Sequence, residues 1–153
     1  MPLVLENPNS LAELVGREIG VTDWSTITQD LIQQFAEVTG DRQWIHVDPD
    51  RAKRDSPFET TIAHGFLTLS LLSHSIRQVI EIQNGVGMTV NYGLNRVRFP
   101  APVRVDSRIR SHFVVQSLKR VPGALEVVFG VSIEVEGSDK PCCVAEWVLR
   151  YYS

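Results

Sequence analysis

The sequence predicts an α+β fold in which an antiparallel sheet wraps around one buried helix. Residues 64–80, with the sequence HGFLTLSLLSHSIRQVI, place apolar side chains around most of a helical wheel. A helix of that kind is buried on nearly all sides. Four runs with a period of two follow, at residues 88–99, 105–115, 125–135 and 144–152. Turns containing proline or glycine separate the runs, and successive strands joined in this way form an antiparallel sheet.

Shorter elements precede the buried helix. Ser10 is a candidate cap for a short helix that runs through Val15, and residues 24–27 fit a brief extended piece. Thr28 has the side chain of a helix N-cap and Gly40 is a typical stop signal, so we expect a helix between them. The apolar residues of this helix follow helical spacing: Leu31, Ile32, Phe35 and Val38.

Residues 41–63 follow neither period and form an irregular segment before the buried helix. Asp48 and Pro49 predict one short helix within it, with Asp48 as the cap and Pro49 in the first turn. Long irregular segments inside compact domains are usually functional or disordered. Four apolar side chains favour an ordered and functional segment: Trp44, Ile45, Pro57 and Phe58.

Length and composition predict one globular domain over residues 1–153, with 43% hydrophobic and 22% charged residues. The N-terminus has no signal-peptide pattern, and the strongly apolar stretch at 66–72 is too short to span a bilayer. Cys142 and Cys143 are adjacent, so a disulfide between them would be strained. The chain also has no CxxC or HExxH motif. We therefore expect a cytoplasmic protein with reduced thiols and no membrane segment, nucleic-acid partner, metal or cofactor.

Charge is distributed unevenly along the chain. Residues 1–60 hold eleven acidic and five basic side chains, whereas residues 96–120 hold seven basic and one acidic side chain. A basic patch of this kind can bind phosphates. Two arginine pairs spaced by two fit equally well as outward-facing positions of half-buried strands: Arg96/Arg98 and Arg108/Arg110.

Asp41 and His46 are a candidate acid–base pair. A carboxylate and an imidazole in one loop can hold the same water molecule, so that one group accepts a proton while the other donates one. The hydration of a conjugated double bond requires this combination. On residue types alone, the alternative is a common turn aspartate after Gly40 and an ordinary hydrogen-bonded loop histidine.

His64 and Gly65 form a second candidate element at the start of the buried helix. The first N–H groups of a helix have no partner within it, and with the helix dipole they suit the oxyanion of a thioester carbonyl. Gly65 either admits a substrate closely because it lacks a Cβ atom or relieves crowding between helix and sheet. Ser73 either points into the same site or bonds a backbone carbonyl one turn earlier.

Three motifs in this order resemble the MaoC-like family of R-specific enoyl-CoA hydratases, most of all its mycobacterial and nodulation-protein-N-like branch. They are Gly40-Asp41-x-x-x-x-His46, then His64-Gly65-Phe66-Leu67 with Ser73, then Val97-Arg98-Phe99-Pro100-Ala101-Pro102-Val103. The resemblance covers nearly the whole chain, from Val21 to Tyr152. It implies a hot-dog fold, usually dimeric, in which residues 41–63 form an irregular overhang before the central helix.

The resemblance also implies a hydro-lyase. Such an enzyme reversibly adds water, in a syn manner, to a trans-2-enoyl thioester and gives the (3R)-hydroxyacyl thioester. Asp41 and His46 become the acid–base pair, and either of them can be the base. The Gly65 N–H belongs to the oxyanion site, which His64 adjoins, and Ser73 is a supporting polar group near the pair.

One departure from the family pattern concerns Gln43 and Trp44, which stand where Asn-Pro is commoner. Gln43 keeps an amide that can hold water or His46, and Trp44 is expected to reshape either the pocket wall or the packing of the loop. The departure therefore affects substrate range more than the reaction. If the thioester is carried by CoA, Arg96 and Arg98 are candidates to bind its phosphates, from the neighbouring subunit of a homodimer. Acyl carrier protein is the alternative carrier.

Two other functions fit the same scaffold. An acyl-CoA thioesterase would direct activated water at the carbonyl carbon instead of the β-carbon. A non-catalytic acyl-thioester-binding subunit would use the tunnel without chemistry, and the loss of Asp41 or His46 would be its mark in the sequence. Because both residues are present, the sequence favours hydration and dehydration over the two alternatives.

Overall fold

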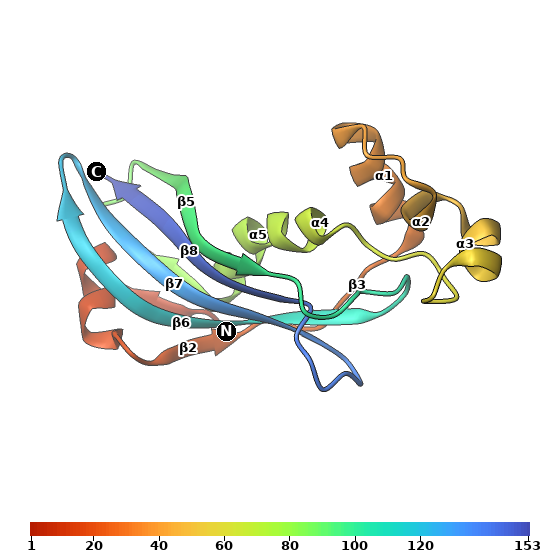
Figure 1. Cartoon of the computed structure of the whole chain (residues 1–153). Coiled ribbons are helices and arrows are strands. Elements are labelled where there is room, and N and C mark those ends of the chain that lie inside the picture. The colour runs from red at the N-terminus through yellow and green to blue at the C-terminus, as the bar shows by residue number, and fades with distance from the viewer.

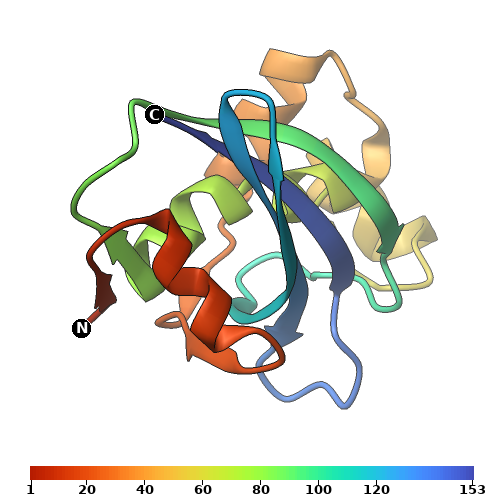
Figure 2. The ribbon, with the colours of Figure 1, turned by 90° about the vertical axis from the view of Figure 1, so that its left-hand side faces the viewer.

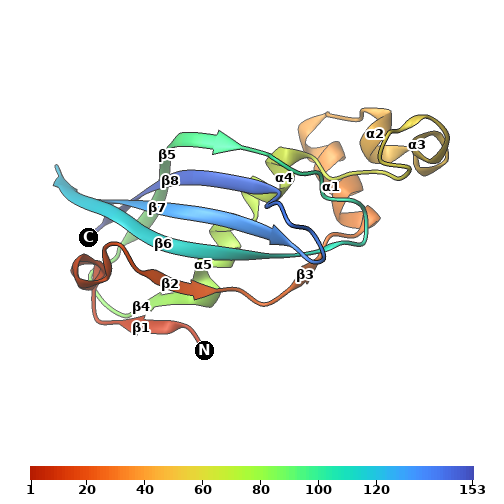
Figure 3. The ribbon, with the colours of Figure 1, turned by 60° about the horizontal axis from the view of Figure 1, so that its bottom comes forward.

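The main sheet of the computed structural model, which describes residues 1–153, is antiparallel and curved (Figure 1). Its strand order is β2–β6–β7–β8–β5, with β3 also paired to β6, and Figure 3 shows the long strands side by side. The strands are β2 (Glu18–Val21), β3 (Ser25–Thr26), β5 (Met88–Arg98), β6 (Arg108–Val121), β7 (Ala124–Val135) and β8 (Cys143–Tyr152). A separate parallel pair joins β1 (Leu3–Leu5) to β4 (Ile80–Ile82).

The helices fall into two groups around this sheet. Helices α4 and α5 pass across one face of the sheet, whereas α1, α2 and α3 gather at one end of it (Figures 1 and 2). Their bounds are α1 (Gln29–Thr39), α2 (Trp44–Val47), α3 (Pro49–Asp55), α4 (Gly65–Ser70) and α5 (Leu72–Val79), and a 3-10 helix η1 (Pro8–Leu14) lies near the N-terminus. A sheet wrapped around a central helical segment confirms the predicted α+β, hot-dog fold.

Helix α1 begins and ends where the sequence predicts. The Thr28 hydroxyl accepts a hydrogen bond from the Leu31 N–H at 3.1 Å, which satisfies one of the free donors of the first turn. Gly40 has a φ of 78°, in the left-handed region that favours glycine, and its N–H donates to the Ala36 carbonyl. This turn ends the helix and leads through Asp41 into α2.

The central helix is interrupted, unlike the continuous helix expected over residues 64–80. It breaks at Leu71 into α4 and α5, where the Ser70 hydroxyl donates to the Leu67 carbonyl at 2.7 Å and the Ser75 hydroxyl donates to the Leu71 carbonyl at 2.9 Å. Hydroxyl bonds of this kind compete with the helical ladder and bend a helix. The expectation of burial on nearly all sides is also wrong, because Phe66 is 70% exposed.

Strand β6 begins at Arg108, later than the expected position 105. The preceding residues pair with the irregular segment instead: the Ala63 N–H donates to the Val103 carbonyl at 2.8 Å, and the Val105 N–H donates to the Thr61 carbonyl at 3.0 Å. These bonds tie the end of the 41–63 segment to the sheet. The segment itself contains α2 and α3, of which α3 is the short helix predicted from Asp48 and Pro49.

The N-terminal helix also differs from the expectation. It is the 3-10 helix η1, which spans Pro8–Leu14 rather than residues 10–15. Its cap is Asn7, whose side-chain oxygen accepts from the Asn9 N–H at 3.0 Å, with Pro8 in the first turn. Ser10 therefore lies inside the helix and does not cap it.

The core lies between α4–α5 and the facing side of the sheet. Leu67, Leu72 and Ile76 pack from the helices, and the rings of Phe113 and Phe129 meet edge to face with centroids 6.5 Å apart. Cys142 and Cys143 are buried free thiols at the start of β8, and burial raises their pKa to about 12 and about 11. Neither thiol is therefore a nucleophile near neutral pH.

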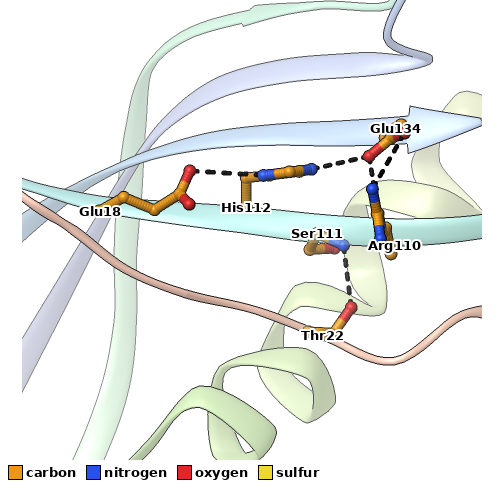
Figure 4. A network of polar contacts seen from close by, with 6 residues as sticks. All are labelled: Glu18, Thr22, Arg110, Ser111, His112 and Glu134. Carbon is orange, nitrogen blue, oxygen red and sulfur yellow. Dashed lines mark hydrogen bonds and ion pairs between the residues drawn. The ribbon is translucent and has the colours of Figure 1, made fainter.

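The opposite side of the sheet carries paired charges (Figure 4). His112 of β6 lies between two carboxylates, with Nε2 2.8 Å from Glu134 and Nδ1 3.4 Å from Glu18. Arg110 also bonds Glu134, at 2.7 Å, and Arg108 pairs with Glu136. These contacts confirm the outward-facing interpretation for Arg108 and Arg110. None of the helices has the length and apolar character needed to cross a membrane.

Candidate active site

Asp41 and His46 face each other at the end of α1 and the start of the irregular segment. Asp41 directly follows the turn at Gly40, and His46 lies in α2. The Asp41 Oδ2 and His46 Nε2 atoms are 4.0 Å apart, too far for a direct hydrogen bond but close enough for one water oxygen to contact both. The Asp41 side chain is 45% exposed and the His46 side chain 7%, so the pair opens to solvent on the aspartate side.

The other carboxylate oxygen of Asp41 serves the backbone. Its Oδ1 atom lies 3.4 Å from the Gln43 N–H, and the Asp41 N–H lies 3.3 Å from the Thr39 hydroxyl. This is the arrangement of a turn aspartate. The turn interpretation and the acid–base interpretation thus concern different oxygen atoms of the same side chain.

The surroundings of His46 fix which of its nitrogens carries the proton. Its Nδ1 atom lies 2.7 Å from the Ile62 carbonyl, which can only accept, so Nδ1 donates and Nε2 presents a lone pair toward Asp41. Gln29, the first residue of α1, donates to the His46 carbonyl at 2.8 Å and accepts from the Thr61 hydroxyl at 2.5 Å. Burial lowers the pKa of His46 below its ordinary value, so the imidazole is neutral near pH 7.

His64 lies directly beside the pair. Its ring is stacked on that of His46, with centroids 3.8 Å apart and an interplanar angle of 21°, and its Nε2 atom is 2.9 Å from the Asp41 backbone oxygen. Phe35 of α1 also contacts the His64 ring, with a centroid distance of 5.0 Å and an interplanar angle of 57°. The sequence placed His64 at the helix start, and the structure adds a direct contact with both members of the pair.

Gly65 is the first residue of α4, and no backbone carbonyl accepts from its N–H group. A Cβ atom at this position would lie 3.1 Å from the ring of Phe99. The neighbour that approaches most closely is therefore a side chain of this chain, as the crowding interpretation expects. The free N–H fits the oxyanion interpretation, so the structure keeps both roles for Gly65.

The side chains of Ser73 and Gln43 make no hydrogen bond to the pair, and Gln43 contacts it only through its backbone. Ser73 lies on α5, where its hydroxyl is 3.4 Å from the Asn91 amide nitrogen. It lines a separate pocket of about 250 Å³ between α5 and strands β5 and β8. Gln43 is exposed, and it serves α2 through its backbone carbonyl, which accepts from the His46 N–H at 3.0 Å. The sequence suggested that Ser73 points into the Asp41–His46 site or bonds a backbone carbonyl one turn earlier. The observed contact with Asn91 is neither of these.

Trp44 opens α2 and lies beneath the guanidinium of Arg51, with the Arg51 Cζ atom 4.4 Å from the ring. This cation–π contact joins α2 to α3. The ring therefore stabilises the packing of the irregular segment, which was one of the two effects expected of it.

Arg96 and Arg98 differ from the arginines of β6. No carboxylate lies within ion-pair distance of either side chain, whereas Arg108 and Arg110 are each paired. Both line a hollow of about 770 Å³ on the outer side of the sheet, where basic and acidic side chains alternate: His112 and Lys140, and the carboxylates of Glu18, Glu134, Asp139 and Glu146. They are consequently the arginines of the basic stretch that are open to a phosphate in this hollow.

The Asp41, His46 and His64 side chains offer ligand atoms within 4.8 Å of one another. Two of the four ring nitrogens already donate to backbone carbonyls. The nitrogen lone pair of an imidazole lies in the plane of the ring. Because the His46 and His64 rings are stacked, the lone pairs of their two remaining nitrogens cannot both point at one metal ion. The cluster therefore does not have the geometry of a metal site.

Comparison with known proteins extends these observations to the whole chain. A sequence model of the MaoC-like domain matches residues 10–136. The chain belongs to the MaoC-like family. It is 48% identical over 147 residues to 3-hydroxyacyl-thioester dehydratase Z of Mycobacterium tuberculosis, with 95% of this chain and 96% of the relative covered. Nodulation protein N of Rhizobium meliloti is 43% identical over 141 residues, with 92% and 88% covered.

A solved structure of similar fold also superposes on the chain. The R-hydratase PhaJ1 from Pseudomonas aeruginosa, in its unliganded form, has a TM-score of 0.69 and 26% identity, with 91% of this chain and 82% of that chain covered. The relatives confirm both the MaoC-like family and the mycobacterial and nodulation-protein-N-like branch that the motifs predicted.

Several residues of this MaoC-like site were not found by sequence reasoning. Gln29, Phe35 and Ile62 all contact His46 or His64, yet each looks like an ordinary residue of its segment. The two residues in each contact are 16 to 29 positions apart in the sequence, and two of the contacts involve a backbone carbonyl. No residue type or short spacing signals a contact of that kind.

Proposed function

We propose that this protein is an R-specific enoyl-thioester hydratase and 3-hydroxyacyl-thioester dehydratase, a hydro-lyase. The observation that carries the proposal is the facing Asp41–His46 pair, 4.0 Å apart, which His64 contacts directly before Gly65 and its free N–H. The names of a 48% identical 3-hydroxyacyl-thioester dehydratase and of a structurally similar R-hydratase support it. The substrate is accordingly an acyl thioester.

In the hydration direction, one water molecule lies between Asp41 Oδ2 and His46 Nε2. His46 is the base, because its Nε2 lone pair faces the gap while its Nδ1 proton is held by the Ile62 carbonyl. As the water oxygen bonds to the β-carbon, Nε2 accepts one water proton and the π electrons move to the thioester oxygen. Asp41 orients the water and stabilises the imidazolium that forms.

The electrons that reach the thioester oxygen form an enolate, which accepts a hydrogen bond from the Gly65 N–H at the positive end of α4. The proton held by the Asp41–His46 pair then returns to the α-carbon. Because the pair lies on one side of the substrate, oxygen and hydrogen add to the same face, which is syn addition. Dehydration follows the same steps in reverse.

The acyl chain extends from Gly65 along α5 in this proposal. The pocket of about 250 Å³ beside Ser73 is lined mostly by apolar side chains, including Ile76, Trp147 and Leu149. Ser73 then supports the acyl pocket through Asn91 instead of the acid–base pair. Apolar walls suit an acyl chain because its burial is favourable.

The carrier of the thioester is CoA in this proposal, bound through Arg96 and Arg98. Their side chains lack carboxylate partners and line the hollow on the outer side of the sheet. Two guanidinium groups spaced by two along a strand suit a phosphate group. A cytoplasmic location is part of the same proposal, since the two buried free thiols, Cys142 and Cys143, fit a reducing compartment.

A homodimer formed through β5 completes the proposal. Strand β5 is the last strand of the sheet, so one of its edges is unpaired, and nearly all of its residues are exposed. Its exposed apolar side chains are Met88, Val90, Tyr92 and Leu94. An open apolar edge needs a partner, and a second β5 related by twofold symmetry supplies one. Analytical ultracentrifugation checks this, and a monomer at micromolar concentration would contradict it.

The experiment for the reaction follows the loss of enoyl-thioester absorbance when the purified protein is mixed with crotonyl-CoA and longer 2-enoyl-CoAs. Free thiol is measured in parallel, and the stereochemistry of the product is determined. Asp41→Asn and His46→Gln should each lower kcat by about 100-fold or more, since each removes one member of the acid–base pair.

Three results are informative. Formation of the (3R)-hydroxyacyl-CoA by the wild type, lost in both variants, supports the hydratase. Release of thiol instead identifies a thioesterase. A folded wild-type protein that turns over no chain length, whether offered on CoA or on acyl carrier protein, is a binding subunit and the proposal is wrong.

A further inference from the structure

His64 links the parts of the candidate site that come from different segments. Its ring stacks on that of His46 of α2 and contacts the tilted ring of Phe35 of α1, and its Nε2 atom bonds the backbone of Asp41. The residue is only 4% exposed. It occupies the N-cap position of α4, but its side chain makes no capping bond there. The side chain therefore contacts the acid–base pair and does not cap the helix.

The hydrogen bonds assign the tautomer of His64. The Asp41 carbonyl can only accept, so Nε2 carries the proton and donates at 2.9 Å. The other nitrogen, Nδ1, is buried and has no hydrogen-bond partner. A buried acceptor without a donor costs stability, and an apolar ring of similar shape would avoid that cost. The bond from Nε2 to Asp41 is thus the only polar interaction that the imidazole gains from its position.

The backbone of His64 leads directly to the second functional element. The Gly65 N–H belongs to the peptide group that the His64 carbonyl forms, and that carbonyl also accepts from the Leu67 N–H at 3.1 Å, in the first turn of α4. One residue consequently contacts the acid–base pair through its ring and orients the oxyanion donor through its backbone.

We propose that His64 is a positioning residue that sets the distance between the Asp41–His46 pair and the Gly65 N–H. This inference rests on the proposed hydratase function. Hydration requires the water to reach the β-carbon while the carbonyl oxygen bonds the N–H, so the two elements must be separated by the length of the conjugated system. A shift of the Asp41 backbone would move the water away from the β-carbon without changing how the carrier is bound.

Two substitutions separate the hydrogen bond from the packing. His64→Gln places an amide N–H near the position of Nε2 and keeps a donor for the Asp41 carbonyl, although it loses the stacked ring. His64→Phe keeps a ring against His46 and Phe35 but has no donor. His74→Gln is the matched control, because His74 is an exposed histidine on α5 whose side chain hydrogen-bonds only Gln78.

The measurements are kcat and KM with crotonyl-CoA, together with the melting temperature of each variant. If His64 positions Asp41, His64→Phe should lower kcat by about 100-fold with KM nearly unchanged, while its melting temperature stays at or above that of the wild type. His64→Gln should be less stable than His64→Phe and yet more active. His74→Gln should match the wild type in both measurements.

The proposal is wrong if His64→Phe is at least as active as His64→Gln, because His64 would then act only through packing. Wild-type activity in both variants overturns it as well, and leaves the hydratase function intact. A wild type without turnover overturns both proposals. Should His64→Phe fail to fold, His64→Leu, which also lacks a donor, provides the same comparison with His64→Gln.

Discussion

The Nδ1 atom of His46 lies 2.7 Å from the backbone oxygen of Ile62, and the Ile62 N–H in turn donates to the Ile45 carbonyl at 3.0 Å. These two bonds join α2 to the end of the 41–63 segment. They hold the imidazole in the tautomer whose Nε2 lone pair faces Asp41. The irregular segment therefore has a direct chemical role, since it fixes the protonation pattern of the proposed base.

The first prediction concerns the pH dependence of activity. Burial lowers the pKa of His46 from its ordinary value of 6.5, helped by the nearby His64, and the bond to Ile62 and the charge of Asp41 only partly oppose this. A base must be unprotonated to accept a proton, so the midpoint of the fall in kcat/KM at low pH should lie below pH 6.5. A pH–rate profile of the wild type checks this, and a midpoint at or above pH 6.5 would contradict it.

The same lowered pKa affects stability. Between the pKa of the folded protein and 6.5, the unfolded chain binds more protons at this residue, so the free energy of unfolding should decrease as the pH falls through this window. His46→Gln removes the titrating group and should flatten that part of the curve. Urea unfolding of both proteins over the window tests the difference; parallel curves would show that His46 is not the group responsible.

The second prediction concerns Gln29, whose amide joins the His46 carbonyl to the Thr61 hydroxyl. Gln29→Ala leaves both groups without this partner, so it should lower the free energy of unfolding by about 1–3 kcal/mol. It should also lower kcat, because α2 loses a contact that fixes His46. Gln34→Ala is the control: Gln34 lies on the same helix, is exposed, and bonds only Asp30. Equal effects of the two substitutions would exclude a specific role for Gln29.

The third prediction separates the two interpretations of Gly65. In Gly65→Ala the new methyl group would lie 3.1 Å from the Phe99 ring, so the ring must move. We expect lower stability and lower kcat. The double variant Gly65→Ala/Phe99→Leu relieves the crowding and should recover the stability. If kcat stays low in the double variant, close approach of the substrate requires the glycine; if kcat recovers, crowding by Phe99 was its only cause.

The parts of this fold that the sequence predicted depend on short-range patterns. Thr28 and Gly40 set both ends of α1 because caps act within one turn, and the alternation of apolar residues located β7 and β8 to within a residue. The start of β6 was missed because residues 105–107 continue the strand-like run but bond Thr61 and Ile27 instead of β7. Nothing in a local pattern reveals which partner a strand-like stretch will choose.

In the candidate site, too, the sequence predicted the short-range contacts and missed the long-range ones. Asp41 and His46 are five positions apart in one loop, so their proximity could be predicted from the sequence. The stacking of His64 on His46 joins residues 18 positions apart and depends on how α1, α2 and α4 pack. Ser73 was expected near the pair, but it lies far enough along the interrupted helix to face Asn91 and Trp147 in a different pocket.

The fourth prediction concerns Arg96 and Arg98, which line the outer hollow without carboxylate partners. If they bind CoA phosphates, Arg96→Glu and Arg98→Glu should each raise KM for crotonyl-CoA by about tenfold, the effect of losing one charge-assisted contact, with little change in kcat. Arg108→Gln is the control, since Arg108 is an outward-facing arginine already paired with Glu136. It should leave KM unchanged.

A second substrate decides whether the phosphates are responsible. Crotonyl-pantetheine has the same reacting group and arm as crotonyl-CoA but lacks the nucleotide and its phosphates. For this substrate the KM of the wild type should already be high, and Arg96→Glu and Arg98→Glu should add nothing to it. Raised salt should narrow the gap between wild type and variants with CoA, because screening weakens an exposed contact. An equal rise in KM for both substrates would mean that the arginines act on the fold and not on CoA.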